Sequence, residues 1–255
     1  MGQKRVYFLS DAHLGSLAIA HDRMRERRMV RFLDEIKDHA SAVYLLGDIF
    51  DFWHEYKYVV PKGYTRLLGK ISELTDGGVE VHFMTGNHDL WCRDYFEKEC
   101  GMVLHRGPLT TDILGKVFFL AHGDGLVASQ RRYNLLRSVF HNRTCQRLFA
   151  AIHPRWGMQF GLAWAKHSRL KHMHQEGCPI DPQRSGLVGF ARGYLATHPE
   201  INFFIFGHRH VAFEMRLAEQ TEMIIVGEWI KSCTYAVFDG EELKMEGYLE
   251  GETKP

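Results

Sequence analysis

The sequence predicts an α/β fold, and the alternation of apolar strands with helices carries this prediction. Five short runs are apolar, rich in β-branched or aromatic residues and almost free of charge, as is typical of strands buried on both faces. They span residues 5–10, 42–46, 79–85, 117–121 and 201–206. Helix-like segments at 22–39 and 63–76 separate the first three runs. The amino-terminal half is therefore expected to form a βαβαβ arrangement.

A short polar block follows or ends each of these runs. The blocks are Asp11-Ala12-His13, Gly47-Asp48, Gly86-Asn87-His88-Asp89, Ala121-His122-Gly123-Asp124 and Gly207-His208-Arg209-His210. Because ligands of open α/β sheets gather outside the carboxyl ends of strands, we expect the blocks to meet at one edge. Two Asp, one Asn and four His from these blocks make a ligand set for two borderline metal ions such as Mn²⁺, Fe or Zn²⁺. Two such ions favour hydrolysis at phosphorus.

Each block taken alone is more typical of a helix cap or a turn than of a functional site. Five blocks at one edge of a sheet favour the functional interpretation. The glycines within the blocks are expected to serve both tight turns and a close approach to metal.

The composition is that of a soluble enzyme with one large core. Of 255 residues, 45% are hydrophobic and 25% are charged. No apolar stretch reaches the roughly 18 residues of a membrane span. The amino terminus runs directly into the first polar block, so we expect no cleaved signal peptide. The five cysteines form no CxxC pair, which predicts reduced thiols in a cytosolic protein.

Charge is distributed unevenly along the chain. Residues 126–175 contain nine Lys or Arg and no Asp or Glu. The whole chain has 32 basic and 31 acidic residues, so the rest of it has 23 basic and 31 acidic residues. Apolar residues recur at helical spacing in the same segment, and Pro154 and Gly157 interrupt it. It is expected to form two to four short helices inserted between the fourth and fifth blocks.

Three interpretations of this insert compete. Its apolar face can simply pack on the body while its charges face solvent. It can bind nucleic acid, although the body is acidic and no known reader motif is present. The third interpretation, which we favour, is a lid that offers apolar walls to acyl chains and cations to phosphates, like an interfacial amphipathic helix.

The order DxH, GD, GNH(D/E), H and GHxH resembles the calcineurin-like metallophosphoesterases. Longer motifs resemble one branch, the UDP-2,3-diacylglucosamine hydrolases of lipid A synthesis. They are SDAHLG at 10–15, LLGDIFDFW at 45–53, GNHDLW at 86–91, HGDGL at 122–126, the insert at 134–154 and VGEW at 226–229. The resemblance implies a layered α-β-β-α sandwich with a helical cap insertion. Its core would span 1–125 and 195–255, and its cap 126–194.

The resemblance also implies two divalent metal ions, most simply Mn²⁺. One site would use Asp11, His13, Asp48 and His210, and the other Asp48, Asn87, His122 and His208. Asp48 would bridge the two ions, and a water held between them would become the nucleophile. His88 would face the substrate, stabilising charge or protonating the leaving oxygen. Asp51, Asp89 and Asp124 are expected to orient metal-bound imidazoles.

The implied reaction converts UDP-2,3-diacylglucosamine to UMP and 2,3-diacylglucosamine 1-phosphate. The residues expected to bind substrate are Asn87, His88, Arg131, Arg132, Arg169, Lys171 and His208, with Arg137 and Arg143 as further cations. The residues expected to wall an acyl groove are Trp53, Trp91, Trp156 and Trp164. The best-known proteobacterial branch carries Arg in place of His88 and an acidic contact near residues 129–132, so this chain resembles a divergent branch.

A cytoplasmic enzyme, peripheral to the inner membrane of a Gram-negative bacterium, would meet such a lipid. Neither nucleic acid nor an obligate protein partner is expected. Two other functions stay open. A phosphoesterase for another substrate, such as a nucleotide or phosphoprotein, would share the body and differ in the insert. A non-enzymatic scaffold would be expected to lack metal ligands, and here all are present.

Overall fold

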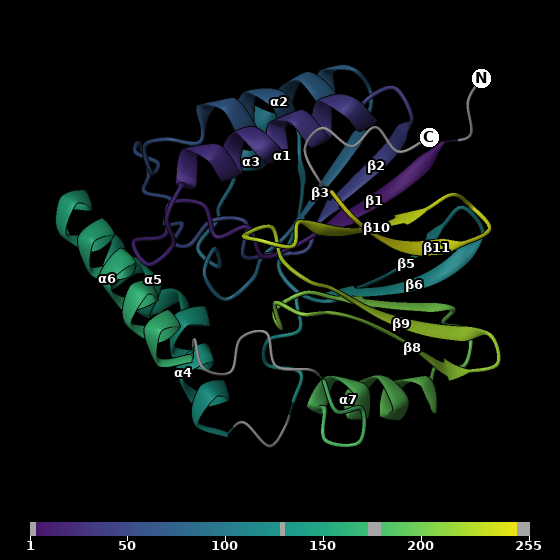
Figure 1. The fold of residues 1–255 in the computed structure, drawn as a ribbon. Helices are drawn as coiled ribbons and strands as arrows, with labels where there is room; N and C mark the ends of the chain where they lie inside the picture. Colours follow the sequence, from purple (N-terminus) through teal and green to yellow (C-terminus); the bar gives the residue numbers. More distant parts are fainter. Residues whose placement is uncertain (1–3, 128–130, 173–179, 249–255) are drawn as a thin grey trace.

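The structure, a computed structural model, describes residues 4–127, 131–172 and 180–248, without the side chains of residues 131–133 and 172. Two β-sheets face each other, and helices cover their outer faces (Figure 1). The sheets account for all five of the predicted apolar runs. The strands that precede the polar blocks lie inside these sheets rather than at their edges.

The first sheet has six strands in the order β11-β10-β1-β2-β3-β4. Their bounds are β1 Arg5–Leu9, β2 Ala40–Leu45, β3 Glu80–Met84, β4 Val103–His105, β10 Thr234–Phe238 and β11 Leu243–Gly247. Strands β1 to β4 are parallel, and β10 and β11 complete the sheet in antiparallel pairing. Leu9 lies opposite Leu45 in the register. The blocks that follow β1 and β2 therefore begin side by side.

The second sheet has five strands in the order β5-β6-β7-β9-β8. Their bounds are β5 Leu109–Ile113, β6 Lys116–Ala121, β7 Phe203–Phe206, β8 Ala212–Ala218 and β9 Thr221–Val226. Strands β6, β7 and β9 are parallel. Ala121 lies opposite Phe206, which places the fourth and fifth blocks next to each other at the end of this sheet.

The core lies in three apolar layers. Between the sheets, the Phe8 ring stacks on Phe118 with centroids 5.7 Å apart. Helices α1 (Asp22–Ile36), α2 (Thr65–Asp76) and α3 (Tyr95–Cys100) cover the first sheet, and α7 (Gly186–Leu195) covers the second through Leu187 and Val188. The expected α-β-β-α sandwich is confirmed.

Three helices lie together to one side of the sandwich (Figure 1). These cap helices are α4 (Arg131–His141), α5 (Arg143–Ala150) and α6 (Pro154–His172). The predicted cap range 126–194 also includes α7, which packs on the second sheet instead. None of the helices within the described ranges has the length and apolar composition needed to cross a membrane.

Helix α6 runs through Gly157, where the sequence predicted an interruption. A Cβ at Gly157 would lie 2.1 Å from Tyr56 Oη, and one at Gly161 would lie 2.2 Å from Phe52 Cζ. These glycines therefore serve close packing of α6 on the loop that follows the second block. Pro154 occupies the first position of the helix, where its missing N–H costs no hydrogen bond.

Candidate metal centre

The polar blocks meet at the carboxyl ends of the strands and form three groups of candidate metal ligands. Within each group, the ligand atoms lie within 4.8 Å of one another. The groups are Asp11, His13 and His210; Asp48, His122 and His208; and His13, Asp51 and His88. The first two groups match the two predicted ligand sets, apart from the shared Asp48 and the amide of Asn87. We call the seven predicted ligands the metal centre.

Asp48 connects the first two groups. Its Oδ2 atom lies 3.3 Å from His122 Nε2 in one group and 3.6 Å from His13 Nε2 in the other. The carboxylate is almost fully buried, so its charge is poorly screened by water. This position between two imidazoles is the one that a bridging carboxylate would need.

Several polar atoms of the centre are buried without a hydrogen bond to any described residue. They include Asp11 Oδ1, Asn87 Oδ1 and His122 Nε2. Asp11 Oδ1 lies 3.1 Å from His210 Nε2. Buried polar atoms without partners are costly. Imidazole nitrogen, carboxylate oxygen and amide oxygen converging in this way fit borderline divalent cations.

Neighbouring groups fix the orientation of two imidazoles that are predicted ligands. His122 Nδ1 donates a hydrogen bond to the Leu46 carbonyl oxygen at 2.8 Å, which leaves Nε2 facing Asp48. Asp51 Oδ1 lies 3.2 Å from His13 Nδ1, the position expected for a carboxylate that orients a ligand. Burial disfavours charge on His122, yet the Asp48 carboxylate raises its pKa well above the usual range. A cation between these two residues would replace that proton.

The backbone of the metal centre is strained in a way that the sequence does not reveal. Five of the seven predicted ligands have positive φ angles between 44° and 69°; they are Asp11, His13, Asp48, His208 and His210. Non-glycine residues rarely adopt this left-handed region, and Asp and His are among those that tolerate it best. Such outliers cluster at functional sites. Gly86 is required for close approach, because a Cβ there would lie 2.2 Å from Asp48 Oδ1.

Asp89 has a different role from the predicted one. Its carboxylate accepts hydrogen bonds from four backbone N–H groups, those of Asp48, Ile49, Phe50 and Gly86, at 2.8–3.3 Å. It therefore joins the second and third blocks through their backbones rather than orienting an imidazole. Arg25, which sequence reasoning missed, holds the first block similarly, because its Nη1 donates to the Ala12 carbonyl oxygen at 2.6 Å.

His88 lies beside the centre and is fixed from both sides. Its backbone N–H donates to Asp48 Oδ1 at 2.9 Å, and its ring Nδ1 donates to the Asp51 carbonyl oxygen at 2.8 Å. Since Nδ1 is occupied, Nε2 is the ring nitrogen available to a substrate. The His88 ring also stands edge-on to His13, with centroids 4.8 Å apart.

The predicted substrate contacts of the insert have different environments. Arg169 is buried, and its Nη2 lies 3.3 Å from Asp51 Oδ1, so it joins helix α6 to the metal centre. Lys171 is exposed on the same helix. The side chains of Arg131 and Arg132 lie outside the described part of the structure. Arg137 pairs at 2.7 Å with Asp124, the residue expected to orient an imidazole.

The four tryptophans predicted to wall an acyl groove also lie in different environments. Trp53 is fully buried in the core and packs on Phe96, so it cannot wall an exposed groove. Trp91 lies between core and cap, and its Nε1 donates to the Phe140 carbonyl oxygen at 2.9 Å. Trp156 and Trp164 are exposed on α6.

Comparison with known proteins identifies the family of this chain. Residues 4–212 match the Calcineurin-like phosphoesterase family. The chain is 42% identical to a UDP-2,3-diacylglucosamine hydrolase of Porphyromonas gingivalis, over 96% of this chain and 97% of the relative. It is 30% identical to a UDP-2,3-diacylglucosamine hydrolase of Neisseria meningitidis, over 89% of this chain and 90% of the relative.

Proposed function

The chain belongs to the UDP-2,3-diacylglucosamine hydrolases within the calcineurin-like phosphoesterases, and we propose that it hydrolyses UDP-2,3-diacylglucosamine to UMP and 2,3-diacylglucosamine 1-phosphate. This is a step of lipid A biosynthesis. The observation that carries the chemistry is the position of Asp48, 3.3 Å from His122 Nε2 and 3.6 Å from His13 Nε2. One carboxylate thereby lies beside both ligand groups, as a carboxylate shared by two cations would.

The proposed cofactors are two divalent ions, with Mn²⁺ the preferred one. Carboxylate and amide oxygens suit Mn²⁺, while the four imidazoles would also accept Fe or Zn²⁺. Asp11, His13, Asp48 and His210 would hold one ion, and Asp48, Asn87, His122 and His208 the other. When bound, the two ions would activate a water molecule and neutralise charge on the reacting phosphate.

Residues of the chain itself would position the substrate and handle protons. Asn87 supplies a neutral carbonyl oxygen, which limits the negative charge that an anionic diphosphate meets. His88 is proposed to stabilise charge or to protonate the leaving oxygen through Nε2. Its Nδ1–H is held by the Asp51 carbonyl oxygen, so the ring cannot turn away without losing that hydrogen bond. Asn87, His88 and His208 would thus contact the phosphates.

The cap helices are proposed to receive the acyl chains. Large apolar side chains are exposed on or beside α5 and α6; they are Leu148, Ile152, Trp156, Phe160, Trp164 and Leu170. The surrounding segment 126–175 carries nine Lys or Arg and no acidic residue. Apolar groups flanked by cations suit an interface with anionic lipid. We therefore propose that the enzyme works at the cytoplasmic face of the inner membrane as a peripheral protein.

The test compares UDP-2,3-diacylglucosamine with UDP-N-acetylglucosamine and an aryl phosphate. Each buried methylene contributes about 0.8 kcal/mol, so burying even four would favour the lipid by roughly a hundredfold in kcat/KM. Phe160→Asp on the cap is expected to reduce this preference at least tenfold. Leu114→Asp, at an exposed leucine of the β5–β6 turn, is the matched control and should leave it unchanged. Equal rates on acylated and non-acylated UDP-sugars would contradict the proposal and favour another phosphoesterase.

A further inference from the structure

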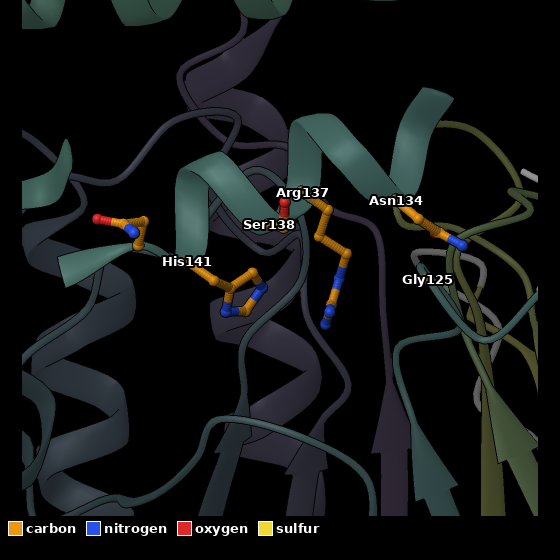
Figure 2. A pocket seen from close by; sticks show the side chains of 6 residues that line it. Gly125, Asn134, Arg137, Ser138 and His141 are labelled. Atoms are coloured by element: carbon orange, nitrogen blue, oxygen red, sulfur yellow. The ribbon is translucent and has the colours of Figure 1, made fainter. Parts of the chain in front are cut away.

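A polar hollow lies between helix α4 and the loop that follows the fourth block (Figure 2). Its volume is about 590 Å³, which is within the usual range of small-molecule sites. The lining residues are Gly125, Asn134, Arg137, Ser138, His141 and Asn142. Positions 134, 137, 138 and 141 recur at the spacing of one helix face. A single stripe of α4 therefore faces the hollow.

Helix α4 packs Phe140 on Trp91, with ring centroids 5.7 Å apart, but leaves its other described large apolar side chains exposed. Its polar stripe lines the hollow, whereas Leu135, Leu136 and Val139 on the other faces are 69%, 37% and 44% exposed. A helix that only packed on the body would turn its apolar side inward. The arrangement of α4 is consistent with a polar ligand occupying the hollow.

The charge of the lining favours a neutral polar ligand over an anion. Arg137 Nε donates to Asp124 Oδ2 at 2.7 Å, so the guanidinium charge is largely offset. Burial, followed by the charge of Arg137, lowers the pKa of His141, which keeps the imidazole neutral near pH 7. No other ionisable side chain lines the hollow among the described residues. A phosphate would gain little binding energy in this hollow. A neutral group that both donates and accepts hydrogen bonds would gain more.

The position of the hollow relates it to the metal centre. Gly125 lies three residues after the predicted ligand His122, so their Cα atoms are at most about 11 Å apart. Asp124, which holds Arg137 at 2.7 Å, lies two residues after His122. A ligand with its phosphate at the metal centre can therefore extend into the hollow.

We propose that this hollow binds the uridine half of the substrate, with the uracil edge hydrogen-bonded by Asn134, Arg137 and His141. The inference rests on the proposed function, because UDP-2,3-diacylglucosamine has one polar, uncharged end and one acyl end. Uracil presents two carbonyl acceptors and one imide N–H. The Arg137 guanidinium has N–H groups beyond the one given to Asp124, and Asn134 Oδ1 accepts no hydrogen bond from a described residue. The acyl end would then lie toward α5 and α6.

The experiment measures UMP and inorganic phosphate binding to the metal-loaded protein by titration calorimetry. Wild-type protein should bind UMP at least tenfold more tightly than phosphate, because only UMP fills the hollow. Asn134→Leu and His141→Leu should each weaken UMP roughly tenfold, the effect of one lost hydrogen bond, and leave phosphate affinity unchanged. Val139→Ala, on the opposite face of α4, is the matched control and should bind UMP like wild type.

Unchanged UMP affinity in both hollow variants would overturn the inference. An equal loss of phosphate affinity would also overturn it, because the substitutions would then act on the metal centre. Hydrolysis of UDP-2,3-diacylglucosamine by the wild-type protein, measured in parallel, tests the proposed function separately. Hydrolysis combined with unchanged UMP affinity in the variants would retain the function and remove the uridine site.

Discussion

Replacing Arg169 with methionine is expected to loosen the cap from the core. Arg169 comes from α6, its side chain is 3% exposed, and its Nη2 lies 3.3 Å from Asp51 Oδ1. Asp51 is fully buried and lies 3.2 Å from His13 Nδ1 in the metal centre. Methionine retains most of the aliphatic stem of arginine and removes only its charge and hydrogen bonds. The substitution therefore tests the polar contacts of Arg169, of which the ion pair with Asp51 joins cap and core.

The magnitude follows from the distance and the burial. Two unit charges 3.3 Å apart interact by about 5 kcal/mol at an effective dielectric constant of about 20. Removing one partner of a buried pair generally costs about 3–5 kcal/mol, because the other charge stays buried. The imidazoles of His13 and His88 lie near Asp51 and can partly stabilise its carboxylate once Arg169 is gone. We expect a loss of about 3 kcal/mol, at the lower end of that range.

Hydrogen exchange of the α6 amides measures this loss. A change of about 3 kcal/mol in local opening accelerates exchange roughly a hundredfold, while helix α1 should be unaffected. Arg155→Met, at an exposed arginine of the same helix, is the control. A double-mutant cycle with Asp51→Asn apportions the effect to the pair. Unchanged α6 exchange in Arg169→Met, with only a raised KM, would refute the reasoning and restore Arg169 as a substrate contact.

Three further predictions concern the metal centre and the core beneath the cap. Asp48→Ala should remove both ions and abolish turnover, whereas Asn87→Ala should mainly affect one ion. Metal analysis by mass spectrometry checks this, and full turnover after rigorous chelation would contradict it. His88→Ala should retain both ions but lose about 10²–10⁴ in turnover, and a near-normal rate would remove His88 from the mechanism. Burial lowers the pKa of His54 to about 4, from an ordinary value of 6.5. The unfolded chain therefore binds this proton first as the pH falls, and the fold loses up to about 3 kcal/mol between pH 6.5 and pH 4. His54→Phe should flatten this dependence in urea unfolding, and an unchanged slope would show that other groups cause it.

The positions of the polar blocks could be predicted because their signals are local. An apolar run marks a buried strand, and the parallel register then brings its polar end beside the next, as Leu9 and Leu45 show. The distant contacts could not be predicted in this way. Arg169 and Asp51 are 118 residues apart in sequence, and only the packing of α6 brings them together. The role of Gly157 could not be predicted for the same reason. Its neighbour Tyr56 is distant in the sequence, and the Tyr56 hydroxyl leaves no room for a Cβ at position 157.

Backbone conformation was the other feature that the sequence did not predict. The left-handed φ angles of Asp11 and Asp48 arise where tertiary contacts determine the chain direction, such as the Asp11 N–H donating to the Gly47 carbonyl oxygen at 3.1 Å. Propensity gives no signal for this, beyond the tolerance of Asp and His for such angles. The role of Asp89 was missed because its four partners are backbone N–H groups, which no sequence motif identifies.

The ligands of the metal centre come from both sheets of the sandwich. Asp11 and Asp48 follow strands of the first sheet, and His122 and His208 follow strands of the second. Cations held between them would act as staples across the sandwich, joining early and late segments of the chain. Their binding energy would be available only after the two sheets have docked, so it would add to the cooperativity of folding. The same ions that serve catalysis would then make the two halves of the molecule unfold as one.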